Sequence, residues 1–384
     1  MNFGFDEQQK SFGDTVANVL ADVPALMSPE LSPPPHDAVW SALAEIGLFA
    51  LLVPDRFDGV GMSLVDLALA VEALGAGLAP PAVAATLAAT DLIIRHGTDA
   101  QHHDLLPRIA AGTIKAAVAV LEADQGYDPN DVQTTLEGNC LNGTKILVGD
   151  AAEANLFLVV SKSHGRPALV LVNASDPGIA LHAHDNLDPT SGYCAVTFTN
   201  VAIGGDAVLG GAGAENAMER LMEVSATISA GLLMGSAARM LATAVDYVKV
   251  RVQFGQAIGA FQAIKHRCAD MAMAVEAGRS ASYYAFWAVS EGAPNRARAA
   301  SMAKAYCGGV SRQVCNETIQ LHGGMGFTWD LGLHRFLRRA KVIEHSYGDA
   351  AWHNERVLSA TLAELDAAAH ERRDAAKPIG QRSV

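Results

Sequence analysis

The chain has 384 residues, of which 50% are hydrophobic and 18% are charged. This length fits two or three domains, and the composition supports a sizeable core and excludes disorder for most of the chain. The formal net charge of −13 argues against a nucleic-acid partner, because phosphate backbones repel an acidic surface. Four basic residues near the C-terminus are expected to form a solvated helix face: Arg335, Arg338, Arg339 and Lys341.

Cysteine usage and hydropathy bear on the compartment. The five cysteines are scattered and form no C-x-x-C motif, which argues for a reducing compartment and against a disulfide framework or a zinc site. The first twenty residues carry four charges and lack the apolar stretch of a signal peptide. No uncharged apolar run reaches the ~18 residues of a membrane span, so we expect a soluble, cytoplasmic protein without a membrane partner.

The first part of the chain has the period of amphipathic helices. Apolar residues recur at three-and-four spacing over residues 5–20, 37–48, 63–74 and 81–96. Ser63 supplies N-cap chemistry, and prolines punctuate the connections. We expect an N-terminal α-helical domain over residues 1–114.

The pattern changes near residue 115. Short apolar or alternating runs, with turn residues such as Asn142-Gly143 between them, follow at 116–121, 140–148, 155–160, 168–172 and 193–200. They indicate strands and turns, and they predict a middle antiparallel β domain over residues 115–212.

The helical period returns at about residue 213. Residues 225–244 are dense in Ala, Gly and Ser, which lets helix backbones approach closely, and they are expected to form the buried interior of a bundle. The charged tail after residue 367 is expected to fray. The fold class is therefore α+β in the order α, β, α, with a C-terminal helical domain over residues 213–384.

Two segments in the C-terminal part suit a dinucleotide. Arg251 opens R-V-Q-F-G-Q between two predicted long helices, where its guanidinium could hold a phosphate and Phe254 could cover an adenine face. Residues 320–327, Q-L-H-G-G-M-G-F, have three glycines in four positions, and their backbone N–H groups suit a pyrophosphate. Taken alone, an R-x-x-F-G segment is more often a helix hairpin with a surface arginine, and a G-G-x-G segment is more often a helix C-cap.

Shorter motifs accompany these segments elsewhere in the chain. They are L-A-E-I-G-L at 43–48, V-P at 53–54, G-M-S at 61–63, E-A-L-G at 72–75, L-P at 106–107 and N-G-T-K at 142–145. Together with the α-β-α order, they make the chain resemble the acyl-CoA dehydrogenase family over nearly its whole length. The matches at residues 251–271 and 320–327 are the most specific.

The resemblance implies an α-helical domain, a β domain and a four-helix bundle, assembled as a dimer of dimers. It implies FAD between the β domain and the bundle, with the adenosine end reaching the neighbouring subunit. By the family pattern, the pyrophosphate and adenosine of the neighbour's FAD would be contacted by Arg251, Phe254, Gln320, Gly323 and Gly324. Ile258 and Phe261 would line the same place.

The reaction that the resemblance implies is α,β-dehydrogenation of an acyl-CoA thioester to the 2-enoyl-CoA. Hydrogen bonds to the thioester carbonyl stabilise the developing enolate, a Glu removes the α-proton, and the β-hydrogen leaves as hydride to the flavin. The electrons then pass to an electron-transfer flavoprotein. The family acts in β-oxidation of fatty acids or steroid side chains, and the acyl chain used here is not readable from the sequence.

The sequence departs from the family at the catalytic base. The usual Glu position is Tyr347, and a phenol with an ordinary pKa near 10 is a poor base. The alternative base position, 26 residues before the R-x-x-F-G motif, is Ser225. Three nearby carboxylates remain as weak candidates: Glu223, Glu344 and Asp349.

The β domain departs as well. The family's T-E-P-x-A-G-S-D loop, which holds the flavin ring, is L-E-A-D-Q-G-Y-D here, so Leu121 and Tyr127 replace the hydroxyl residues. The W-I-T segment beside the ring is Leu147-Val148-Gly149. The residues with which a subunit would bind its own flavin ring are thus replaced, whereas the residues that it would offer to its neighbour's FAD are retained.

This asymmetry gives the hypothesis that the chain is the non-catalytic partner in an α2β2 heterotetramer and completes the FAD site of a catalytic sister. Residues 348–353 resemble the partner-type subunits of such heteromers. The alternatives are a self-sufficient homotetrameric dehydrogenase with a relocated base, a flavin oxidase or monooxygenase of the same fold, and a flavin-free interaction protein. No metal is expected, because Gly348 interrupts the i, i+4, i+8 alignment of His345, Asp349 and His353.

Overall fold

The N-terminal region is helical, as expected. The computed structural model describes residues 4–22, 36–128, 131–204 and 207–375. Its first helices are α1 (Glu7–Ala21), α2 (His36–Glu45), α3 (Ala68–Ala76), α4 (Pro81–His96) and α5 (Asp99–Ala110), with 3-10 turns at Leu48–Ala50, Asp55–Phe57 and Leu64–Leu67. Capping boxes, in which side chains satisfy the first free N–H groups, begin α1 at Asp6 and α5 at Thr98.

The middle region forms one eight-stranded sheet. Its strands are β1 (Ala116–Ala119), β2 (Thr135–Glu137), β3 (Cys140–Val148), β4 (Leu156–Ser163), β5 (Arg166–Asn173), β6 (Ile179–Ala183), β7 (Cys194–Ala202) and β8 (Val208–Leu209). They pair in the order β6-β7-β3-β2-β4-β5-β8, with β1 beside β4. The expectation of an antiparallel sheet is wrong in part, because β4 pairs in parallel with both β1 and β2. The sheet is mixed.

Alternation along β4 sets the two faces of the sheet. Leu156, Leu158 and Val160 belong to a core shared with the helices, whereas Phe157 and Val159 belong to a second core beneath the sheet. The segment Asn142-Gly143 is not a turn, because it lies inside β3 at a register shift. A Cβ on Gly143 would lie 2.3 Å from Thr134 Oγ1, so a close strand crossing accounts for this glycine.

The C-terminal region consists of long helices. They are α6 (Ala214–Val250), α7 (Gln262–Ser290), α8 (Arg296–His322), α9 (Leu333–His345) and α10 (Ala350–Ala375). Between them lie the hairpin β9 (Val252–Gln253) and β10 (Gln256–Ala257) and 3-10 turns at Gly211–Gly213, Ile258–Ala260 and Gly323–Phe327. Helix α10 continues past the residue where fraying was expected, and residues 376–384 lie outside the described part of the chain.

Helix α6 is the buried centre of this region, as its small residues predicted. It packs against α3, α7 and α8, and an added Cβ on Gly235 would lie 1.8 Å from the Glu72 carbonyl oxygen. Within the described residues, α6 alone is long and apolar enough to cross a membrane, but 61% of its most apolar window is buried inside the protein. That burial is what the core helix of a globular domain shows.

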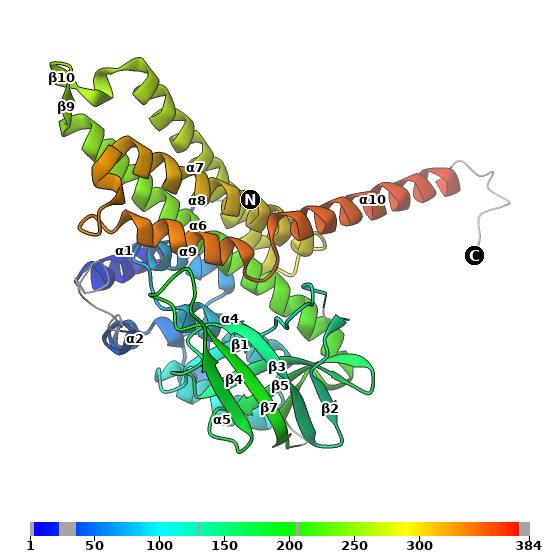
Figure 1. The fold of residues 1–384 in the computed structure, drawn as a ribbon. Helices are drawn as coiled ribbons and strands as arrows, with labels where there is room; N and C mark the ends of the chain where they lie inside the picture. The colour runs from blue at the N-terminus through cyan, green and yellow to red at the C-terminus, as the bar shows by residue number, and fades with distance from the viewer. Residues whose placement is uncertain (1–3, 23–35, 129–130, 205–206, 376–384) are drawn as a thin grey trace.

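Figure 1 shows how these regions are arranged. The sheet lies at one end of the molecule, and α6 runs from it to the β9–β10 hairpin at the opposite end. Helix α10 extends away from the body of the molecule. The expected order of helices, sheet and helices is therefore confirmed, and the sheet and the hairpin are remote from each other.

Candidate functional site

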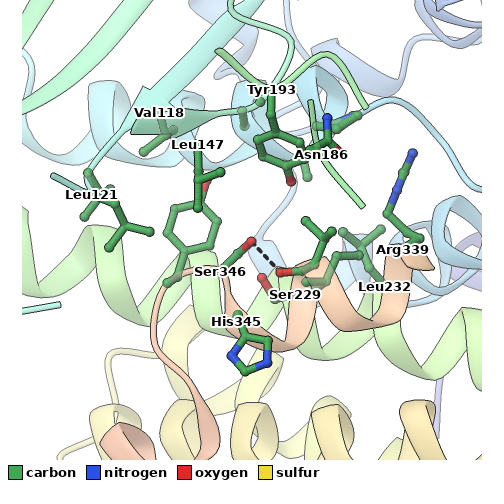
Figure 2. A pocket seen from close by; sticks show the side chains of 18 of the residues that line it. Val118, Leu121, Leu147, Asn186, Tyr193, Ser229, Leu232, Arg339, His345 and Ser346 are labelled. Carbon is green, nitrogen blue, oxygen red and sulfur yellow. Dashed lines mark hydrogen bonds between the residues drawn. The ribbon is translucent and has the colours of Figure 1, made fainter. Parts of the chain in front are cut away.

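A cavity of about 530 Å3 lies where the three regions meet. Its walls come from the start of α4, from β1 and β3, from α6, and from α9 with the loop that follows it. Figure 2 shows Val118, Leu121 and Leu147 on the strand side and Ser229, Leu232 and Ser346 on the helix side. This size and mostly apolar lining are typical of a small-molecule site.

The strand-side wall owes its shape to a bulge in β3. The register of β3 against β7 shifts between Lys145 and Val148, so the consecutive residues Ile146 and Leu147 both line the cavity. Leu147 has φ +51°, a left-handed conformation that is costly for a bulky residue and is a feature of functional sites. Its side chain is 48% exposed at the cavity.

A buried ion pair fixes the loop beside this wall. Lys145 Nζ donates to Glu122 Oε1 at 2.7 Å and to the carbonyl oxygen of Val120 at 3.0 Å. Burial lowers the pKa of Lys145 to about 8, against the opposing pull of Glu122. Val120 and Leu121 are thereby held in the cavity wall.

Tyr127 closes the cavity on the side of the last two helices. Its hydroxyl donates to the carbonyl oxygen of His345, and its ring lies 5.9 Å from the ring of Trp352. Burial raises the pKa of this phenol, so the donor stays protonated and is used within the protein. Tyr127 thus ties the loop of the β region to the end of α9.

The loop between α9 and α10 presents Tyr347 to the cavity. Lys304 Nζ donates to the carbonyl oxygens of Glu344 and Gly348 at 2.9 and 3.0 Å, and His353 Nε2 lies 3.1 Å from the carbonyl oxygen of Tyr347. Burial lowers the pKa of His353 to about 3, so the imidazole is neutral and Nε2 carries the proton that the carbonyl accepts. Tyr347 itself has φ +56°, a strained conformation that these contacts hold in place.

The phenols of Tyr347 and Tyr193 are weak acids in this cavity. Burial raises the pKa of Tyr193 to about 12 and raises that of Tyr347, to which Tyr193 also contributes. Both hydroxyls are therefore protonated donors at neutral pH. The group at the expected base position cannot accept a proton there.

The other base candidates lie outside the cavity. Glu223 pairs with Arg296 at 3.0 Å, Glu344 pairs with Arg312 at 3.0 Å, and Asp349 accepts from the backbone of Trp352. Ser225 is buried, and its hydroxyl has no partner in the described structure. Among the described residues that line the cavity, the only acidic side chain is Asp185, which is exposed on the β6–β7 loop.

The basic cluster on α9 corrects the expectation of a solvated face. Arg335 and Arg339 are buried. Arg339 donates to Asp188 on the β6–β7 loop and, at 2.7 Å, to the carbonyl oxygen of Ala79 just before α4. One guanidinium therefore joins the three regions at the edge of the cavity, where Lys341 also lies.

His182 and His184 lie close together in the chain but differ in their surroundings. His182 is exposed on β6, but His184 lines the cavity and its Nε2 is buried without a hydrogen-bond partner. Tyr193 and Asp188 were not singled out from the sequence. The only sequence signal for Tyr193 is its place at the start of an alternating strand.

The residues expected to contact a neighbour's FAD lie together at the far end of the molecule. Arg251 is exposed at the end of α6 and leads into the β9–β10 hairpin, in which Phe254 is 92% exposed and its ring lies 6.2 Å from the ring of Phe261. Gln320, Gly323 and Gly324 are also exposed, and Ile258 is half-buried. The rings of Tyr247 and His322 stack at 4.1 Å and so join the ends of α6 and α8 that carry the two motifs.

His345, Asp349 and His353 do not share a helix face. Helix α9 ends at His345 and α10 begins at Ala350, with Gly348 in the left-handed region between them. In the residues that the structure describes, no group of three His, Cys, Asp or Glu side chains is placed to hold a metal ion.

Comparison with known proteins agrees with this architecture. Residues 6–113 match the acyl-CoA dehydrogenase N-terminal domain model, and residues 211–380 match the C-terminal domain model. An acyl-CoA dehydrogenase of Bacillus subtilis (strain 168) is 30% identical over 78% of this chain and 82% of its own length. The chain belongs to the acyl-CoA dehydrogenase family.

Two solved structures extend the likeness to the whole fold. Butyryl-CoA dehydrogenase from Megasphaera elsdenii matches with a TM-score of 0.87 and 25% identity, over 94% of this chain and 100% of that one. A chain of the ChsE4–ChsE5 complex from Mycobacterium tuberculosis matches with a TM-score of 0.84 and 25% identity, over 95% and 99%. Acyl-CoA dehydrogenases are FAD-dependent oxidoreductases, so the expected family, fold and enzyme class are confirmed.

Proposed function

We propose that this acyl-CoA dehydrogenase chain is a cytoplasmic subunit of a heterotetramer that completes the FAD site of a catalytic sister subunit. The sister would dehydrogenate an acyl-CoA and pass electrons to an electron-transfer flavoprotein. The observation that carries the proposal is Tyr347, a protonated phenol at the position where the family holds its catalytic carboxylate. We also propose that the N-terminal helical domain ends at residue 114 and that the middle β domain ends at residue 212.

The chain's own cavity fits a flavin ring poorly. An isoalloxazine carries several nitrogen and oxygen atoms that need hydrogen-bond partners when buried. The wall where the family holds that ring presents Val118, Leu121, Ile146 and Leu147, and the hydroxyl of Tyr127 is already bonded to His345. The side chains of this wall offer no free hydrogen-bond donor to the polar edge of the ring.

The far end of the molecule fits the adenosine end of FAD. Arg251 and the ring of Phe254 are exposed there, and Phe254 has a ring contact with Phe261. Gly323 and Gly324 of the second motif are exposed as well. A guanidinium can bind a pyrophosphate in bidentate geometry, and an aromatic face can cover adenine. An exposed ring on a tight hairpin is costly to keep in water, which favours an interface.

In this proposal only the far end of the molecule serves the reaction. FAD in the sister's site supplies the hydride acceptor when bound. Arg251 and Phe254 of this chain would fix the distal end of the cofactor, and Gln320 would donate to it. Tyr347 and Tyr193 keep their protons and take no part in proton abstraction.

The experiment is to express the chain alone and together with a same-family chain from its genome, and to measure FAD per chain by absorbance after gel filtration. We expect essentially no FAD with the chain alone and about half an FAD per chain in the co-expressed tetramer. One FAD per chain in the isolated protein would refute the proposal and favour a self-sufficient homotetramer.

Single substitutions test which residues of this chain contribute to FAD binding by the tetramer. Arg251→Ala should weaken FAD binding by the tetramer about tenfold to a hundredfold, because a charged hydrogen bond to a phosphate is lost. Arg267→Ala is the matched control, since Arg267 is an exposed arginine on α7 that pairs with Glu317. Peroxide release under air would identify the oxidase alternative, and absence of FAD with every candidate partner would identify a flavin-free interaction protein.

A further inference from the structure

Helix α8 carries an uncharged stripe of residues on its outer side. Five of these residues are exposed and Gly309 is half-buried, and their spacing alternates between four and three. They are Met302, Tyr306, Gly309, Gln313, Asn316 and Gln320. A solvent-facing helix side normally carries charged residues, whereas an alternating 4-3 spacing of uncharged residues is typical of the seam between two packed helices. We call these six residues the α8 seam.

The middle of the α8 seam is hollowed. Tyr306, Gly309, Gln313 and Asn316 line this surface hollow. A Cβ built on Gly309 would meet no heavy atom within 4 Å, whereas one on Gly308 would lie 3.1 Å from Glu344 Cγ. Internal packing therefore accounts for Gly308 but not for Gly309, although glycine weakens a helix interior. A small residue at this place lets the backbone of a second helix approach closely.

The seam is complementary to itself in an antiparallel pair. When the equivalent helix of a second subunit is centred opposite residue 311, every seam position faces another seam position. Met302 then faces the position aligned with Gln320, Tyr306 faces that of Asn316, and Gly309 faces that of Gln313. The longer Gln313 side chain thus meets the gap above a glycine, as in knobs-into-holes packing.

The same pairing brings Gln320 to another subunit's cavity. Lys304 Nζ donates to the carbonyl oxygen of Gly348 at 3.0 Å, and the loop it holds presents Tyr347 to the cavity. Gln320 lies sixteen residues farther along α8, or about 24 Å at 1.5 Å per residue, so it is remote from its own cavity. In the antiparallel pair it faces the neighbour's position 302, within one helical turn of the neighbour's position 304.

We propose that the α8 seam docks antiparallel on the equivalent helix of the catalytic sister subunit, with the crossing at Gly309 and Gln313. Tyr306, which is 44% exposed, is the aromatic anchor of this contact. The inference rests on the proposed function, because the sister is taken to be the subunit whose FAD Gln320 reaches. Docking through α8 is what carries the residues of this chain to that cofactor.

The first test fills the hollow. Gly309→Leu, co-expressed with the sister, should weaken assembly about tenfold or more, because its side chain occupies the space into which the sister's helix packs. The isolated variant should melt at or slightly above the wild-type temperature, since the site is open and leucine favours a helix. Ala100→Leu, at an exposed position of α5, is the matched control and should assemble normally.

The second test reads the direction of the pair by disulfide formation, in a chain that lacks the exposed Cys140. Asn316→Cys should link to a cysteine at the sister position aligned with Tyr306. It should not link to one aligned with Asn316, which lies about 15 Å away along the sister's helix. A link to the second position and not to the first would refute the antiparallel pairing.

The outcomes separate this inference from the proposed function. If Gly309→Leu assembles and holds FAD as the wild type does, the α8 seam is refuted while the FAD-completing role stands. If the wild type alone forms a homodimer that Gly309→Leu breaks, a second copy occupies the seam and the assignment to a sister is overturned. If the wild type assembles with no same-family chain, both proposals fail. Loss of assembly in Gly309→Leu, with assembly retained in Arg251→Ala, supports both.

Discussion

The substitution Asp188→Asn tests whether the joint between the three regions rests on charge. Asp188 is fully buried and accepts from Arg339, from Thr190 and, at 2.6 Å, from Ser191. Burial alone would raise the pKa of this carboxyl, but Arg339 and the two hydroxyls outweigh it and lower the pKa from 3.8 to about 2. A shift of this size corresponds to about 2 kcal/mol of folding free energy above pH 4.

The asparagine costs more than this, because it leaves Arg339 charged and buried. Removing one member of a buried ion pair typically costs about 3–5 kcal/mol. The amide N–H group of the new side chain also faces the guanidinium donors. The remaining acceptors of Arg339, the carbonyl oxygen of Ala79 and the hydroxyl of Thr190, carry no compensating charge.

The assay is urea unfolding at pH 7, followed by circular dichroism. We expect Asp188→Asn to lower the free energy of unfolding by about 3–5 kcal/mol, and the exposed neighbour Asp185→Asn to lower it by less than about 0.5 kcal/mol. In the wild type the contribution of Asp188 is present above pH 4 and is lost as the pH falls through 2, and the variant should lack this part of the acid dependence. Equal stability of the two asparagine variants would refute the reasoning.

Three further predictions concern other parts of the molecule. Burial lowers the pKa of Lys304 from 10.5 to about 8. Between pH 8 and 9.5 the free energy of unfolding of the wild type should therefore rise by about 2 kcal/mol, and that of Lys304→Met should lack this rise. The same pH dependence of urea unfolding in both proteins would contradict this prediction. Gly235→Val should cost more than about 4 kcal/mol or prevent soluble expression, since its Cβ would lie 1.8 Å from the Glu72 carbonyl oxygen, whereas Gly309→Ala, with open space, should be tolerated within about 1 kcal/mol. Phe254→Ala should change thermal stability little, because the ring is 92% exposed, yet should reduce the FAD content of a co-expressed tetramer; an unchanged content would count against the interface.

Local patterns predicted the elements well. The helix over residues 81–96 and the strand over residues 140–148 have the expected bounds, because each follows from the periodicity of its own residues. The buried character of α6 followed in the same way from its small residues. The break that the sequence predicted between two long helices lies between α6 and α7, after Arg251.

Long-range pairing was beyond the reach of these patterns. The parallel neighbours of β4 come from segments up to forty residues away, and nothing in the alternation of a single strand specifies its partner. The burial of Arg339 depends on Asp188, which lies 151 residues earlier. A basic cluster can be recognised as buried only when its distant carboxylate is known, and the place of His184 in the cavity is fixed in the same non-local way.

The origin of the cavity walls has a consequence during synthesis. The wall residues from β1, from β3 and from the segment between them are complete in sequence at Leu147, but the opposing wall ends at Tyr347, about two hundred residues later. At about 5–20 residues per second, a ribosome needs roughly 10–40 s to make that stretch. For this time Leu121, Ile146 and Leu147 face water on a half-built molecule, which makes the nascent sheet a natural client for chaperones that bind apolar strands.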